Sequence, residues 1–172
     1  SLRFMVKPNN LRKVSIARLK QEMQDTVFLS DDLAITTIDY LRNPTSEIPV
    51  SLDGFAAMIM MSGSAVLSID TETYEVRPNM LVFFRPGSII RTIRCSSDAT
   101  AYLVACSKAF VSDIQVDISA SLPIHMRFGR KPCLQVTERD VAEIRQFFQL
   151  IKTVIQSDKE RYRKEIIHTL FT

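Results

Sequence analysis

Residues 52–90 read LDGFAAMIMMSGSAVLSIDTETYEVRPNMLVFFRPGSII, and this stretch decides the fold class. Short runs of β-branched, aromatic and methionine side chains alternate with turn residues, and no helical spacing of apolar residues interrupts them. Pro86-Gly87 predicts a type II turn, because proline presets φ at the second turn position and glycine accepts a positive φ at the third. Ser62-Gly63-Ser64 and Asp70-Thr71-Glu72 supply two further turns. Short antiparallel strands are therefore expected.

The same pattern extends on both sides of this stretch. Strands are predicted near residues 33–41, 54–61, 64–69, 73–76, 80–85, 89–94 and 99–105. Ser96-Ser97-Asp98 is expected to close the last hairpin. Strands this short, without helices between them, indicate an antiparallel sandwich or barrel and not a parallel sheet with crossover helices. A weak apolar stripe over 9–24 indicates an N-terminal helix, and a short helix is expected over 108–114.

Near the C-terminus the apolar period changes to that of a helix. Thr137 and Asp140 form a capping box, with aspartate in place of the usual glutamate, and begin this helix. Its apolar stripe is a predicted homodimer interface, although packing against the chain's own barrel would use the same side chains. The stripe residues are Val141, Ile144, Phe148, Ile151 and Ile155.

A second capping box, Ser157 to Glu160, begins another amphipathic helix. Its apolar side carries Tyr162, Ile166, Ile167, Leu170 and Phe171. The pattern is unfinished at Thr172, so we expect further chain beyond this residue. The predicted fold is therefore mainly β with C-terminal α: an antiparallel β-barrel or sandwich over residues 1–131, then two amphipathic helices as a linker and dimerisation segment over 132–172.

Composition narrows the class of protein. The chain has 172 residues, of which 46% are hydrophobic, and this content suits one main core. It contains neither a signal peptide nor an apolar run long enough to cross a membrane, so we expect a cytoplasmic protein without membrane partners. The net charge is +3, yet residues 1–20 carry six basic side chains and no acidic one. This basic run could contact a polyanion or form a solvated face.

Catalytic and metal-binding patterns are missing from the sequence. Its two histidines, His125 and His168, are far apart, whereas metal-binding barrels gather several histidines with a carboxylate. The three cysteines, Cys95, Cys106 and Cys133, form neither a disulfide framework nor a zinc motif. No Gly-x-Ser-x-Gly motif occurs, and four glycines cannot build a phosphate loop. We therefore predict no enzyme activity, no catalytic residues, no metal and no cofactor.

A ligand pocket inside the barrel is the remaining candidate site. Apolar side chains would line it, and an arginine at its mouth would offer a cation to a carboxylate or a sugar hydroxyl. The alternative is that the apolar side chains fill an ordinary core and the arginines are solvated. The candidate pocket residues are Met58, Met60, Leu67, Phe83, Arg85, Arg91 and Tyr102.

The stretch 52–90 resembles the N-terminal cupin-like domain of AraC-type bacterial transcription regulators. YLVACSKAFVSDI at 102–114 and CLQVTERDVAEIRQFFQLI at 133–151 are similar to the next segment and the linker helix of that family, and RYRKEIIHTL at 161–170 resembles the helix before its DNA-binding part. The resemblance implies a cupin-like barrel that senses an unknown small-molecule effector, forms a homodimer and regulates transcription. DNA would be bound only by helix-turn-helix motifs that are missing from this chain.

The resemblance also implies that the cupin metal site is lost. Metal-binding cupins carry histidines where this chain has residues 49–51 and 90–91. Two alternative functions stay open. One is a metal-free cupin enzyme, such as a sugar epimerase or isomerase, which would need an acid–base pair. The other is a freestanding module that binds carbohydrate or protein.

Overall fold

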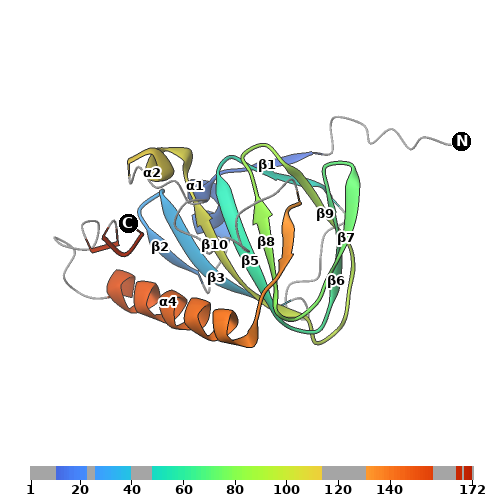
Figure 1. Cartoon of the computed structure of the whole chain (residues 1–172). Coiled ribbons are helices and arrows are strands. Elements are labelled where there is room, and N and C mark those ends of the chain that lie inside the picture. The colour runs from blue at the N-terminus through green and yellow to red at the C-terminus, as the bar shows by residue number, and fades with distance from the viewer. Residues whose placement is uncertain are drawn as a thin grey trace, which may run out of the picture.

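The computed structural model of the chain describes residues 11–22, 26–39, 48–113, 131–156, 166–167 and 169–171. Their strands form two sheets that face each other (Figure 1). The five-stranded sheet has the order β1 (Arg12–Val14), β4 (Val50–Leu52), β9 (Ile89–Cys95), β6 (Ala65–Ile69) and β7 (Glu72–Val76). The six-stranded sheet has the order β11 (Cys133–Gln135), β8 (Met80–Phe84), β5 (Phe55–Ser62), β10 (Thr100–Cys106), β3 (Leu33–Asp39) and β2 (Val27–Leu29).

The mainly β fold with a C-terminal helix is confirmed. All seven predicted strands form, with small shifts at their ends. Sequence patterning missed β1, β2, β4 and β11, because a strand of three residues is too short to display an alternating pattern. The helix expected over 9–24 is present only as α1 (Ile16–Glu22), because residues 12–14 of that range form β1 instead. The short helix expected over 108–114 is α2 (Lys108–Asp113). The predicted division of the chain at residue 132 stays a prediction.

The local geometry of two predicted turns is confirmed. Gly87 has a φ of 81°, and the backbone N–H of Ser88 donates to the carbonyl of Arg85 at 3.1 Å, as a type II turn requires. Gly63 has a φ of 68°. The expected hairpin at Ser96 to Asp98 is wrong, because β9 and β10 belong to different sheets. This turn crosses between the sheets, and a turn residue does not encode which sheet the next strand joins.

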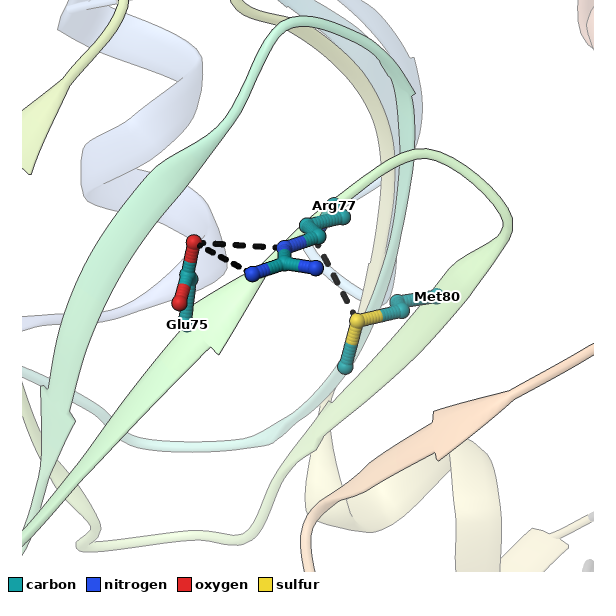
Figure 2. A network of polar contacts seen from close by, with 3 residues as sticks. All are labelled: Glu75, Arg77 and Met80. Carbon is teal, nitrogen blue, oxygen red and sulfur yellow. Dashed lines mark hydrogen bonds and ion pairs between the residues drawn. The ribbon is translucent and has the colours of Figure 1, made fainter.

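The link from β7 to β8 is held by local contacts of Arg77 (Figure 2). Its guanidinium donates to Oε1 of Glu75 from Nε at 3.2 Å and from Nη2 at 3.0 Å. Its backbone N–H donates to Sδ of Met80 at 3.3 Å. The side chains of Arg77 and Glu75 are exposed, so the pair contributes little to stability. It does neutralise the charge of Glu75.

The third main element is α4 (Glu138–Gln156), which lies along the six-stranded sheet (Figure 1). Its predicted capping box is present: the backbone N–H of Asp140 donates to Oγ1 of Thr137 at 3.1 Å, and the backbone N–H of Thr137 donates to Oδ2 of Asp140 at 3.0 Å. Residues 166–167 and 169–171 are helical, in agreement with the second predicted helix. Its capping box at 157–160 and Tyr162 lie outside the described residues.

We expect Gly63→Ala to destabilise the fold more than Gly87→Ala. Both positions have a positive φ, which costs a residue with a Cβ roughly 1–2 kcal/mol. A Cβ at position 63 would also lie 2.6 Å from the Cα of Ala99, whereas a Cβ at position 87 meets nothing within 4 Å. Urea unfolding should give a loss of about 1–2 kcal/mol for Gly87→Ala and about 3 kcal/mol or more for Gly63→Ala. Equal losses would contradict this prediction.

Candidate functional site

The space between the two sheets is the candidate ligand site. Inward-facing side chains from both sheets form one apolar cluster there. On the six-stranded sheet, Ala105 of β10 lies opposite Ala34 of β3 on one side and Ala56 of β5 on the other. Directly opposed residues share a face of the sheet. Three alanines therefore stand in one row across the central strands, and side-chain volume is low along it.

Larger and more adaptable side chains occupy the neighbouring rows. Leu103 of β10 lies opposite Met58 of β5, and Ala101 lies opposite Met60. Methionine has an unbranched, polarisable side chain that adjusts to irregular shapes. The inner face of the six-stranded sheet thus combines small side chains with flexible ones.

Helix α1 packs against this cluster. Ile16, which is 2% exposed, belongs to the same cluster as the alanine row, and Leu19 is partly buried against it. The helix also contacts β3, which carries Ala34. Helix α1 therefore covers part of the cluster on the β3 side.

The described interior offers little polar chemistry. Thr36 and Ser51 are the buried polar residues of the described part of the chain, and no buried charged side chain occurs there. Ser51 faces the outer side of the five-stranded sheet, because its neighbour Leu52 belongs to the inner cluster. Thr36 is already engaged, because Oγ1 of Thr26 donates to its Oγ1 at 2.9 Å. Apolar walls with few polar groups are typical of small-molecule sites.

Two polar side chains reach the rim of the cluster from the sheet edges. Tyr74 of β7 and Cys133 of β11 both pack against the cluster and are partly buried. Loss of contact with water raises the pKa of the Tyr74 hydroxyl, and the charge of Glu72 raises it further. Burial raises the pKa of the Cys133 thiol to about 11. Both groups therefore stay protonated near neutral pH and present neutral donors.

The structure divides the seven predicted pocket residues. Met58, Met60 and Leu67 are buried between the sheets. Phe83 and Tyr102 face the opposite side of the six-stranded sheet, where they pack against a separate cluster. Arg85 and Arg91 are exposed. The sequence analysis did not identify the row of alanines. A signal was present in β10, where Ala101 and Ala105 lie an even number of positions apart and therefore face the same side of the strand.

The apolar stripe of α4 packs on the chain's own sheet. Val141, Phe148, Ile151 and Ile155 are buried, and Ile144 is partly buried, in clusters that they share with outward-facing residues of the six-stranded sheet. The rings of Phe148 and Tyr102 of β10 lie 5.5 Å apart at a tilt of 35°. Intramolecular packing therefore already uses the predicted dimer stripe, as the alternative prediction stated. A homodimer formed through α4 would have to use another face of this helix.

The remaining reactive residues are dispersed. Cys106 is buried on the outer side of the six-stranded sheet, and burial raises the pKa of its thiol to about 12. In the described part of the chain, no three histidine, cysteine or acidic side chains gather into a metal-binding group. His125 and His168 lie outside the described residues. No helix found in the described ranges is both long and apolar enough to cross a membrane.

Comparison with solved structures gives matches of low sequence identity. ToxT from Vibrio cholerae in its apo form has 11% identity and a TM-score of 0.47, and the match covers 81% of this chain and 53% of ToxT. ToxT with a bound unsaturated fatty acid has 12% identity and a TM-score of 0.47, with 87% and 54% covered. A putative mannose-6-phosphate isomerase from Ralstonia eutropha has 16% identity and a TM-score of 0.41, with 49% and 83% covered.

The chain therefore spans about half the length of the ToxT structures that it matches. No curated protein matches its sequence. The family model described as AraC-like ligand binding domain matches residues 46–171, which include both sheets' central strands and α4. Because this model covers most of the chain, the protein belongs to the family of AraC-like ligand-binding domains.

Proposed function

We propose that the chain senses a small-molecule effector between its two sheets and passes the state of this site to α4. The observation that carries the proposal is that strand β10 contributes side chains to clusters on both faces of its sheet. Ala101, Leu103 and Ala105 join the inner cluster, while Tyr102 and Val104 pack on the outer side of the sheet. Successive residues of a strand face opposite sides, so one rigid strand joins both environments.

The lining favours a largely apolar effector. Ala34, Ala56 and Ala105 have small side chains, so an effector bound along this row would displace little side-chain volume. The flexible methionines can adjust to the shape of the effector. Tyr74 and Cys133 at the rim supply neutral hydrogen-bonding groups for one polar end. A charged or heavily hydroxylated ligand would lose its hydration without gaining enough partners. This argument disfavours a role for Arg85 or Arg91 at the mouth.

Contact between Tyr102 and Phe148 is the proposed route to α4. A guest that widens the space between the sheets would press on β10, and the ring of Tyr102 would shift against Phe148. Packed interiors transmit such displacements because they contain little free volume. A change in the position or stability of α4 would then reach whatever follows this helix in the polypeptide.

The remaining parts of the proposal follow from the family. We propose that the chain is the sensing part of a transcription regulator and not an enzyme, that it works in the cytoplasm, and that DNA is bound only by another part of the polypeptide. A metal-free isomerase is the second candidate, but no acid–base pair faces the inner cluster among the described residues. We also propose that the chain forms a homodimer through an exposed apolar side chain of α4, Leu150.

On α4, the side next to the buried stripe remains apolar. Leu150 is 47% exposed. The neighbouring Phe147 and Val154 are partly buried against the chain's own cluster, and the ring of Phe147 packs edge-on against Phe171 with centroids 5.5 Å apart. The spacing of Phe147, Leu150 and Val154 places them on one edge of the helix. We propose that this edge contacts a second copy, while the buried stripe at Val141 and Ile151 holds the helix in place.

Filling the alanine row should block binding of an apolar probe. We expect Ala105→Met to weaken binding of N-phenyl-1-naphthylamine at least about tenfold, because the new side chain occupies the low row between the sheets. Val104→Met introduces the same methionine side chain on the other side of β10 and should leave binding unchanged. Fluorescence titration measures the affinity, and thermal unfolding by circular dichroism verifies that both variants are folded. Unchanged binding by a folded Ala105→Met variant would contradict the site.

Removing the ring at position 102 should uncouple the site from α4. In the native protein, we expect saturating N-phenyl-1-naphthylamine to change amide hydrogen exchange within α4. Tyr102→Leu should bind the probe but lose this response, whereas Tyr102→Phe, which keeps the ring, should retain it. Exchange followed by mass spectrometry resolves the helix. An unchanged response in Tyr102→Leu would reject the route and leave the binding site itself intact.

A charge on the exposed edge of α4 should weaken the proposed dimer. We expect Leu150→Glu to raise the dimer dissociation constant at least about tenfold, since a carboxylate would be desolvated in the interface. Gln149→Glu introduces the same carboxylate at the adjacent exposed position and serves as the control. Light scattering across a concentration series measures both. A native protein that stays monomeric, or a Leu150→Glu variant that dimerises normally, would overturn this part of the proposal.

A further inference from the structure

We infer that the outer face of the five-stranded sheet docks an acidic, amphipathic segment of a partner protein. The face, here called the β9 face, is built around the exposed side chains of the central strand β9. Its members are Ile89, Arg91, Ile93 and Arg94, together with Lys13 of β1. This inference is independent of the proposed effector site, because these side chains lie outside the inner cluster.

Strand pairing puts these residues on one side of the sheet. Lys13 lies opposite Ser51, and Ser51 lies opposite Ile89. Further along β9, Arg91 lies opposite Ser68 of β6, whose neighbours Leu67 and Ile69 point into the core. Opposed residues share a face, and alternate residues share it along a strand. The β9 face therefore lies on the side of the sheet that runs from β1 across β4 and β9 to β6. Its β4 member, Ser51, is buried, so the exposed side chains come from β1 and β9.

A β-bulge adds an exposed arginine to the face. The register between β6 and β9 shifts between Val66 and Leu67, so that Arg94 lies opposite Val66 and Thr92 lies opposite Leu67. Ile93 is the extra residue of the bulge. Ile93 and Arg94 are thus consecutive and both exposed, which regular alternation would not permit. Bulges commonly redirect side chains in this way.

The two isoleucines on the face are unusually accessible. Ile89 is 41% exposed and Ile93 is 46% exposed, although β9 is an interior strand of its sheet. Removing large aliphatic side chains from water is favourable, so covering the two isoleucines would stabilise a complex. Their position between cationic side chains matches the apolar centre and polar rim of protein interfaces.

The charge of the face is positive. Arg91 and Arg94 have no ion pair in the described part of the chain, and Lys13 is exposed. Two acidic residues lie near the face. Glu75 is paired with Arg77 (Figure 2), and Oδ1 of Asp70 accepts a hydrogen bond from the backbone N–H of Ile89 at 3.0 Å. Strand β1 also lies within residues 1–20 of the sequence, which contain six basic residues and no acidic one. A complementary partner must therefore be acidic.

Two other occupants fit the face less well. Nucleic-acid backbones are bound by cationic and polar groups, and they do not require exposed isoleucines at the centre of the site. A second copy that used the same face would bring Arg91 and Arg94 close to their own counterparts, and like charges oppose that contact. An acidic segment with an apolar stripe satisfies both the charge and the aliphatic side chains.

The test uses a fluorescein-labelled helical peptide of about 20 residues, with leucine along one stripe and glutamate beside it. Fluorescence anisotropy should detect binding to the native chain that weakens as salt rises from about 0.05 to about 0.3 M. Ile93→Ser and Arg94→Glu should each weaken binding at least about tenfold. Ile166→Ser and Arg145→Glu make the same changes at exposed positions outside the β9 face and should bind as the native chain does.

Each other outcome overturns the inference. No binding of the peptide, or equal binding by all four variants, rejects the β9 face as a site for an acidic segment. Tighter binding of a 20-base-pair DNA duplex that is lost in Arg94→Glu but kept in Ile93→Ser assigns the face to nucleic acid. Dissociation of a native dimer by Ile93→Ser assigns it to a second copy. N-phenyl-1-naphthylamine binding is unaffected in every case, so failure here is distinguishable from failure of the effector site.

Discussion

Apolar side chains on both faces of the six-stranded sheet are the constraint on which the rest of the structure depends. Strand β5 buries Met58 and Met60 on the inner side and Ile59 on the outer side. Such a sheet is stable only when both faces are covered. The five-stranded sheet covers the inner face, and α4 covers much of the outer one (Figure 1). Neither partner is optional, because each removes a complete apolar surface from water.

The same constraint links the proposed sensing site to the proposed output. The space between the sheets and the underside of α4 are separated by one layer of backbone, of which β10 is a central strand. Small residues such as Ala105 face the inner side, whereas the ring of Tyr102 meets Phe148 on the outer side. A bound effector and helix α4 would therefore contact opposite faces of strand β10. The outer face of the five-stranded sheet is remote from this pathway and is free for a separate role.

Part of the candidate site was predictable from sequence. Met58, Met60 and Leu67 were assigned to the interior because apolar side chains dominate their strands, and they are buried there. Phe83 and Tyr102 were assigned to the same space, although they face α4. In a strand that is apolar on both sides, hydrophobicity does not distinguish the two faces. The size of the side chains was the better signal, since the alanines of β10 mark the inner side.

The sequence by itself determined the local features: seven strands, the type II turn at Gly87 and the capping box at Thr137, because each depends on residues within a few positions of one another. Only the tertiary structure decided that the turn at Ser96 crosses between sheets and that the stripe around Phe148 packs on the chain's own barrel. Those outcomes depend on pairing between strands distant in sequence, and on which apolar surface is available when the helix packs.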